Sequence, residues 1–390
     1  MASQAILLLL LARFIGQVPE ITAKIPAIIV FGDSTVDSGN NNEISTVLKS
    51  NFEPYGRDFP GRKPTGRFSN GRLATDFLSE ALGIKPAIPP YLDPAYDISE
   101  FATGVCFASA GTGFDNATSD VLSVIPLWKE LEYYKEYQDK LRKYLGNEKA
   151  NQLLSKALHL ISIGTNDFLE NYYVSSNRSS EYSVGEYQNF LIGIATDFIN
   201  HLYQLGARKI SIIGLAPMGC VPLERTTNIL FGRKCIEAYN NVAKDFNKKL
   251  RGSIMKLQKE LDGIQLVLAD AYDFVLEMID NPNSFGFDDV ETACCGTGYI
   301  EMSYMCNRGT LVTCSDANKY MFWDSFHPTE KTNSIVADYL FKNYLGQFKD
   351  DSAQFKNDPA QLKNDSFSLT MSYMPLCIFV VYITINRFLA

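Results

Sequence analysis

A serine, a histidine and an aspartate stand in positions that suit nucleophilic catalysis. Ser34 follows the apolar run 25–31 in the turn Gly-Asp-Ser, and Asp324 lies three residues before His327. A histidine can take the proton of a serine hydroxyl and later pass it to a leaving alcohol. An aspartate within one turn can hold that imidazole in the right tautomer. These residues therefore predict acyl transfer, with Ser34 as nucleophile, His327 as base and Asp324 as the group that orients the base.

Acyl transfer also needs hydrogen-bond donors for the oxygen that becomes negatively charged. The side-chain amide of Asn166, within Gly-Thr-Asn-Asp, can supply one donor, and the backbone N–H groups of Ser34 and Gly113 can supply two more. Each of these fragments is common alone, since a serine after a strand is usually a cap and such loops usually form turns. The prediction depends on their occurring together, in this order.

Short apolar runs that end in glycine or aspartate recur along the chain and predict strands buried on both faces. The predicted strands are 25–31, 104–109, 158–163, 209–213 and 265–269. The predicted helices between them are 127–145, 187–205 and 235–261. This alternation indicates an α/β domain with a mostly parallel sheet and helices on both faces. Because chemistry gathers at the carboxyl ends of such strands, the sheet would bring the candidate residues together.

The composition is that of a globular, net-acidic protein. The 390 residues are 46% hydrophobic and 21% charged, with a formal net charge of −8. A net-acidic chain lacks the basic footprint of a nucleic-acid-binding protein, so no nucleic-acid partner is expected. There are three histidines, and no dinucleotide loop, Walker loop or H-E-x-x-H motif occurs. The sequence therefore predicts no cofactor and no metal.

Both ends of the chain differ from the single domain predicted over 24–348. Residues 1–23 hold a short apolar run followed by small residues, which predicts a secretory signal peptide, with a buried first helix as the alternative. The extension 349–390 holds a mostly apolar stretch at 371–385, shorter than the roughly 20 residues that span a membrane. We expect a dispensable extension without a firm membrane anchor; a lipid-anchor signal is the alternative.

Eight cysteines and three N-x-[ST] sequons fit a secreted protein. Cys220 and Cys235 are the favoured disulfide pair, whereas Cys106 lies in an apolar run and predicts a buried thiol. Four further cysteines allow three connectivities: Cys294, Cys295, Cys306 and Cys314. The sequons are at Asn116, Asn177 and Asn364. We therefore expect a disulfide-bonded extracellular glycoprotein.

Other polar residues have plainer interpretations. Asp33 and Asp167 are expected to brace the turns of Ser34 and Asn166. His159 lies within an apolar run and predicts a core histidine, whereas His201 is expected to be exposed on a helix. A basic loop is expected to be solvated, with a border on the acyl site as the alternative. Its residues are Arg57, Arg62, Lys63, Arg67 and Arg72.

Six segments together resemble the plant secreted GDSL esterase/lipase family, within the SGNH hydrolases, and in particular its extracellular-lipase, anther-proline-rich-protein-like branch. The segments are FGDSTVDSGNNN (31–42), PTGRFSNGR (64–72), GVCFASAGTG (104–113), ISIGTND (161–167), LAPMGC (215–220) and FWDSFHP (322–328). The resemblance implies a three-layer α/β/α flavodoxin-like SGNH hydrolase fold and ester hydrolysis in the cell wall or apoplast. The family's catalytic and oxyanion residues fall on Ser34, Asp324, His327, Gly113 and Asn166. Gly111 is the less favoured match for the family's oxyanion glycine.

The leading hypothesis is a secreted serine esterase/lipase that hydrolyses carboxylic esters through an acyl-enzyme. An acyltransferase with the same triad is the first alternative, and a non-catalytic secreted binding protein on the same scaffold is the second. The expected partner is a small-molecule, lipid or cell-wall ester. Lipid, cutin-like polyester, acetylated polysaccharide and phenolic ester all stay open, and the sequence does not reveal the acyl chain length or the oligomeric state.

Overall fold

The computed structural model describes residues 25–349, apart from 176, 310 and 311. The signal peptide predicted over 1–23 lies outside the described residues. The predicted extension also lies outside them, apart from residue 349, and so does the sequon at Asn364.

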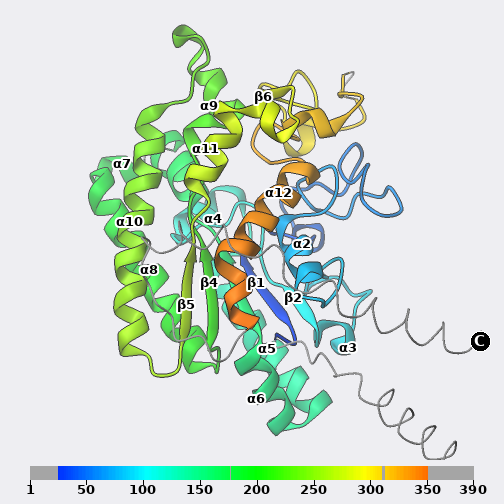
Figure 1. Cartoon of the computed structure of the whole chain (residues 1–390), viewed down its shortest axis with the longest axis vertical. Coiled ribbons are helices and arrows are strands. Elements are labelled where there is room, and N and C mark those ends of the chain that lie inside the picture. Colours follow the sequence, from blue (N-terminus) through cyan, green and yellow to red (C-terminus); the bar gives the residue numbers. More distant parts are fainter. Residues whose placement is uncertain (1–24, 176, 310–311, 350–390) are drawn as a thin grey trace, which may run out of the picture. The chain divides into compact units, whose positions relative to one another are not determined.

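Five parallel strands form the central sheet, and each coincides with a predicted apolar run (Figure 1). They are β1 (Ile28–Gly32), β2 (Gly104–Cys106), β3 (Leu158–Ser162), β4 (Lys209–Ile213) and β5 (Gln265–Ala269). Nearly every strand residue is buried, because helices cover both faces of the sheet. The strand order β2-β1-β3-β4-β5 is that of the flavodoxin-like fold, as predicted.

Helices connect these strands and include the three that were predicted. Those three are α5 (Leu127–Leu145), α8 (Val184–Gln204) and α10 (Glu237–Glu260). The other α-helices of the described residues are α2 (Ala74–Ala81), α3 (Ile98–Phe101), α4 (Asn116–Leu122), α6 (Asn147–Lys156), α7 (Asn177–Glu181), α9 (Pro222–Thr227), α11 (Tyr272–Asp280) and α12 (Glu330–Leu340). A π-helical segment, η2 (Asp167–Val174), follows the loop after β3. In the described part of the chain, no helix combines the length and the apolar character needed to cross a bilayer.

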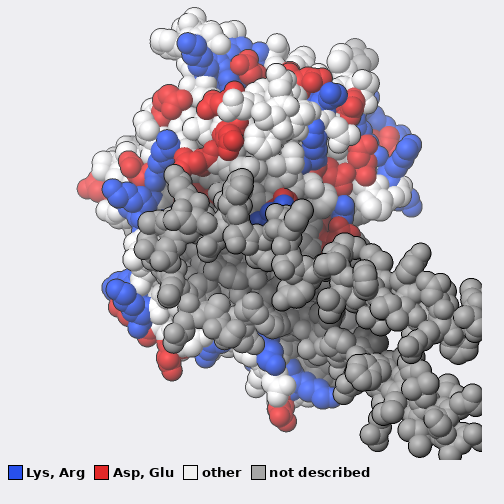
Figure 2. Space-filling view, viewed as in Figure 1, with Lys and Arg blue, Asp and Glu red and all other residues white. Residues whose placement is uncertain are grey.

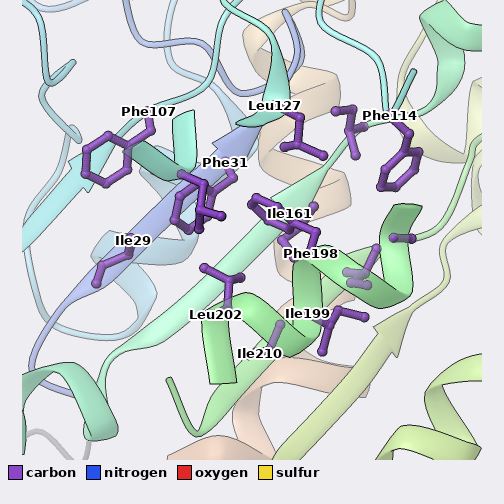
Figure 3. Close-up of a cluster of buried hydrophobic side chains, with 14 of the residues drawn as sticks. Ile29, Phe31, Phe107, Phe114, Leu127, Ile161, Phe198, Ile199, Leu202 and Ile210 are labelled. Carbon is purple, nitrogen blue, oxygen red and sulfur yellow. The ribbon is translucent and has the colours of Figure 1, made fainter. Parts of the chain in front are cut away.

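Phe31 on β1 lies in the core that fills one face of the sheet. Its ring centroid is 5.4 Å from those of Phe107, Tyr134 and Phe198. Figure 3 shows Phe198 of α8 and Ile161 of β3 in the same cluster, to which α5 and α10 also contribute. None of the residues of α12 belongs to this core, and Figure 1 shows α12 crossing in front of the strands. Helices on both faces therefore give the three-layer α/β/α architecture.

A second, two-stranded parallel sheet carries the segment that contains Asp324 and His327. Its strands are β6 (Asp289–Ala293) and β7 (Tyr320–Phe322), which were not predicted. The N–H groups of Cys294 and Cys295 donate to the carbonyls of Phe322 and the residue after it. After β7 the chain turns back at once, because the N–H of residue 323 donates to His327 O at 2.8 Å. The second sheet thus fixes where His327 stands.

The described cysteines form three disulfides. The predicted pair Cys220–Cys235 is confirmed. The cluster of four pairs as Cys294–Cys314 and Cys295–Cys306, which selects one of the three connectivities. Cys106 is free and buried, as predicted, and burial raises the pKa of its thiol to about 12. Two of the disulfides therefore begin directly after β6, beside the segment of His327.

Charged side chains of both signs are intermixed on the described part of the face in Figure 2. The predicted solvation of the basic loop is wrong for Arg67, which is buried. Its guanidinium donates to both carboxylate oxygens of Asp76, at 2.8 and 2.9 Å, and to Ile88 O at 2.8 Å. Such a bidentate pair satisfies the buried charge. None of the five basic residues of this loop lines a cavity beside Ser34.

Candidate active site

Ser34 and Asn166 follow neighbouring strands at a switch point of the sheet. The chain runs from β1 to β2 on one side and from β3 to β4 on the other, so the loops after β1 and β3 diverge. Ligands bind at such points in open parallel sheets. Gly32 ends β1 with a φ of +139°, and a Cβ there would lie 1.9 Å from Ser162 O. A glycine is therefore required for the turn that leads into Ser34.

The structure joins Ser34, His327 and Asp324 in one hydrogen-bonded chain. His327 Nε2 lies 2.8 Å from Ser34 Oγ. His327 Nδ1 lies 2.8 and 2.9 Å from the two carboxylate oxygens of Asp324. Ser34 is 5% exposed, His327 4% and Asp324 0%. Because the carboxylate holds Nδ1 as a donor, Nε2 is left to accept the serine proton.

Asp324 accepts several hydrogen bonds besides the one from the imidazole. Its Oδ1 accepts the N–H groups of Phe326 and His327, at 2.9 and 2.7 Å, and its Oδ2 accepts the Tyr55 hydroxyl at 2.6 Å. The Tyr55 oxygen in turn accepts the Ser303 N–H at 2.8 Å. Burial and the nearby Asp324 carboxylate raise the pKa of Tyr55 well above its usual value, so it stays a donor. Tyr55 was not predicted, because it lies 269 positions from Asp324 in a loop without periodicity.

Asp33 braces the turn of Ser34, as predicted. Its Oδ1 accepts the N–H and the hydroxyl of Thr35, at 2.9 and 2.7 Å. The Thr35 hydroxyl also lies 2.8 Å from the hydroxyl of Ser162 on β3. Burial raises the pKa of Asp33 to about 6, while the bonds from Thr35 and the nearby His327 act to lower it. This carboxyl group therefore ties the turn of Ser34 to the neighbouring strand.

Asn166 lies beside Ser34, and one hydrogen bond holds its side-chain amide. The residue is 2% exposed, and its Nδ2 donates to Thr112 O at 3.0 Å. A side-chain amide has two N–H donors, so the second one is not used by Thr112. Asn166 lines both cavities that adjoin Ser34. This arrangement suits a donor to a reacting carbonyl oxygen.

The two candidate glycines lie in different surroundings. Gly111 lines the smaller cavity together with Ser34 and His327. Gly113 lines neither cavity beside Ser34, and a Cβ there would lie 2.3 Å from Asp167 Oδ1. The structure therefore brings Gly111 to Ser34 and places Gly113 in packing against Asp167. Only the path of the loop distinguishes two glycines that are two positions apart in the sequence.

Two buried carboxyl groups hold the loops after β1, β2 and β3 together. Asp37 accepts the N–H groups of Asn40 and Ala110, at 2.7 and 3.1 Å, which joins the first loop to the second. Asp167 accepts the Phe114 N–H at 2.8 Å, which joins the third loop to the second. Burial raises the pKa of Asp37 to about 6 and that of Asp167 to about 7. Asp167 thus braces the Asn166 turn, as predicted.

Two cavities of different size and character adjoin Ser34. The larger has a volume of about 180 Å³ and has mostly apolar walls from the ends of β3 and β4, from α11 and from α12. The smaller has a volume of about 10 Å³ and is lined by His327, Gly111 and Glu170, among others. His327 lines only the smaller cavity. The larger cavity therefore has room for part of a substrate, whereas the smaller one has room for about one water molecule.

The remaining histidines lie away from these cavities. His159 is buried in β3 with Nε2 2.8 Å from the Tyr134 hydroxyl, and burial lowers its pKa to about 4. It is a core histidine, as predicted, and His201 is exposed on α8. Within the described ranges, no group of three or more His, Cys, Asp or Glu side chains is arranged to hold a metal ion.

Comparisons with known proteins agree on one family. The GDSL-like Lipase/Acylhydrolase family model matches residues 28–340. The chain is similar to GDSL esterase/lipase At4g26790 of Arabidopsis thaliana, with 65% identity over 342 residues, which is 88% of this chain and 97% of that protein. It is also similar to GDSL esterase/lipase At2g04570 of the same plant, with 62% identity over 325 residues, 83% of this chain and 93% of that protein. The chain therefore belongs to the GDSL lipase/acylhydrolase family, as a plant-type GDSL esterase/lipase.

Proposed function

We propose that this GDSL esterase cleaves carboxylic esters through an acyl-enzyme formed on Ser34. His327 Nε2 takes the proton of Ser34 Oγ as that oxygen attacks the ester carbonyl, and then gives the proton to the leaving alcohol. In the second half of the reaction the same nitrogen activates a water molecule, which releases the acid and restores Ser34. Asp324 orients the imidazole and stabilises its cationic form without itself becoming protonated.

Three donors stabilise the negative charge on the carbonyl oxygen in this mechanism. They are the N–H groups of Ser34 and Gly111 and the side-chain amide of Asn166. The contact of Asn166 with Thr112 O at 3.0 Å supports a donor that is oriented before the substrate binds. Gly111 takes the role predicted for Gly113, since Gly111 lines the cavity that contains Ser34.

The observation that carries the proposal is the 2.8 Å contact of His327 Nε2 with Ser34 Oγ, between residues 293 positions apart. The contact is buried, and Nδ1 of the same ring is held by Asp324. The carboxylate is itself held by the Tyr55 hydroxyl at 2.6 Å. A serine nucleophile needs a base that is itself held and oriented, and this ordered series of donors and acceptors provides one. A chance contact between a serine and a histidine would lack this support.

Kinetic assays of alanine variants with a soluble p-nitrophenyl ester test this mechanism. We expect Ser34→Ala and His327→Ala each to lower kcat by roughly 10⁶-fold and Asp324→Ala by roughly 10⁴-fold. The double variant of Ser34 and His327 should be no slower than Ser34→Ala, because the residues act as one unit. An enzyme that keeps its parental kcat without the Ser34 hydroxyl would refute the mechanism.

The proposal takes water as the acyl acceptor, which the names of the relatives support. Product analysis with a competing alcohol tests this choice. We expect the free acid as the main product at low alcohol concentration. An ester of the added alcohol as the main product would indicate an acyltransferase.

We further propose that the protein is secreted to the apoplast and that 24–348 is the whole hydrolase domain. Three disulfides support an oxidising compartment. The apolar run within residues 1–23 supports a signal peptide. Asn116 is exposed at the start of α4, which supports its glycosylation.

A further inference from the structure

We infer that the larger cavity beside Ser34 binds the acyl chain of the substrate and takes a straight chain of about six to eight carbons. The inference rests on the proposed acyl-enzyme on Ser34. It narrows the substrate class from carboxylic esters in general to medium-chain acyl esters.

The walls of this cavity are apolar and come from separate elements. The loops after β3 and β4 supply Ile163 and Leu215, α11 supplies Val275 and Ile279, and α12 supplies Val336 and Leu340. Ser34 and Asn166 also line the cavity, so it begins at the position of the ester carbonyl. An acyl group attached to Ser34 would therefore have its chain among aliphatic side chains.

Two polar side chains of α12 in the cavity wall are already hydrogen-bonded within the protein. The Thr332 hydroxyl donates to Met321 O at 2.7 Å, and Asn333 Nδ2 donates to Arg72 O at 3.2 Å. Because these two side chains are already paired, a polar ligand would gain few hydrogen bonds from them. A polar substituent would lose its own hydration on entering such a space, whereas methylene groups gain from leaving water.

The position of His327 sets the direction in which the substrate binds. This residue protonates the leaving alcohol, so the alcohol must lie on the side of its Nε2. His327 lines the smaller cavity and does not line the larger one. The alcohol therefore lies on the His327 side of Ser34, outside the larger cavity, and the acyl chain enters the larger cavity.

The size of the cavity sets the length of the chain. The volume is about 180 Å³. An apolar cavity of about 150 Å³ accommodates benzene, so at the same packing this one accommodates roughly seven carbons. Thr332 and Leu340 both line the cavity, which extends it about 12 Å along α12. An acetyl group would leave most of this wall without contact, and a palmitoyl chain would exceed the volume about twofold.

A series of p-nitrophenyl esters that differ only in the acyl chain tests the length. Each methylene that enters the cavity should raise kcat/KM by about fourfold, the effect of moving one methylene out of water. We expect kcat/KM to rise from acetate to hexanoate or octanoate and to fall for dodecanoate and hexadecanoate.

Val336→Trp tests the location of the site. The indole would occupy part of the cavity from α12, so the octanoate-to-acetate ratio of kcat/KM should fall by roughly tenfold or more. Asp338→Trp is the matched control, because Asp338 is exposed on the same helix and does not line the cavity. It should keep the parental ratio. Equal ratios in the two variants would overturn the assignment of the cavity.

Binding to an inactive enzyme gives a second readout that needs no turnover. Ser34→Ala should bind octanamide roughly tenfold or more tightly than butanamide in titration calorimetry. The added Val336→Trp change should abolish that preference, and an unchanged preference would count against the cavity. If activity depends on Ser34 but is highest on acetate or hexadecanoate, the acyl-pocket inference fails while the proposed function stands. If activity survives Ser34→Ala, the proposed function fails instead.

Discussion

Replacing Asn166 by alanine separates a donor to the reacting oxygen from a donor that only holds a loop. Loss of one oxyanion donor costs about 2.7–4 kcal/mol in the transition state, so kcat should fall roughly 10²–10³-fold. KM should change little, because the negative charge develops only in the transition state. The substitution also leaves the Thr112 carbonyl without the amide that donates to it at 3.0 Å. We expect the free energy of unfolding to fall by about 1–3 kcal/mol for that reason.

Asn171→Ala is the matched control for this prediction. Asn171 is a buried amide that donates to the Thr118 hydroxyl at 3.0 Å and to the Tyr187 hydroxyl at 3.2 Å, and it lines neither cavity beside Ser34. Its loss should lower the free energy of unfolding and leave kcat nearly unchanged. Steady-state kinetics and urea unfolding of both variants measure the two effects. A similar fall of kcat in the two variants, or a loss of stability alone in Asn166→Ala, would refute the reasoning.

Three further predictions concern the support of the triad and the ends of the chain. Tyr55→Phe keeps the ring but removes the donor to Asp324, so kcat should fall by about tenfold and the free energy of unfolding by about 1–3 kcal/mol; unchanged kinetics and urea unfolding would contradict this. A chain that ends at Phe348 should keep the parental kcat and Tm. Phe348 is buried, and its carbonyl accepts a hydrogen bond from the Lys209 ammonium at 3.0 Å. A marked loss of kcat or Tm would show that 349–390 is needed. N-terminal sequencing of secreted protein should begin close to Lys24, and full-length protein in the cytosol would exclude a signal peptide.

The strands, and the residues Ser34, Asp324 and His327 that the structure joins by hydrogen bonds, could be predicted because their signals are local. Each central strand is a short, continuous apolar run, and burial on both faces removes the alternation that would mark a half-exposed strand. β3 (Leu158–Ser162) matches the predicted run 158–163 to within one residue. Ser34 stands directly after such a run, and Asp324 and His327 are three residues apart. The parallel order of the sheet then brings the distant parts together.

The features that were missed depend on contacts between distant segments. Tyr55 is defined only by its bond to Asp324, and no spacing in the sequence relates the two. Arg67 is buried because Asp76 and backbone carbonyls surround its guanidinium, whereas a cluster of basic residues alone indicates solvation. Gly111 and Gly113 share one loop, and only its three-dimensional path shows which of them adjoins Ser34.

Covalent labelling with a fluorophosphonate probe, followed by mass spectrometry of the labelled peptide, tests the nucleophile most directly. An activated serine attacks the phosphorus as it would attack an ester carbonyl. We expect one adduct, on Ser34, which is lost in Ser34→Ala and strongly reduced in His327→Ala because an unassisted hydroxyl is a poor nucleophile. An adduct on another residue, or labelling that persists undiminished in Ser34→Ala, would contradict the assignment of Ser34 as the nucleophile.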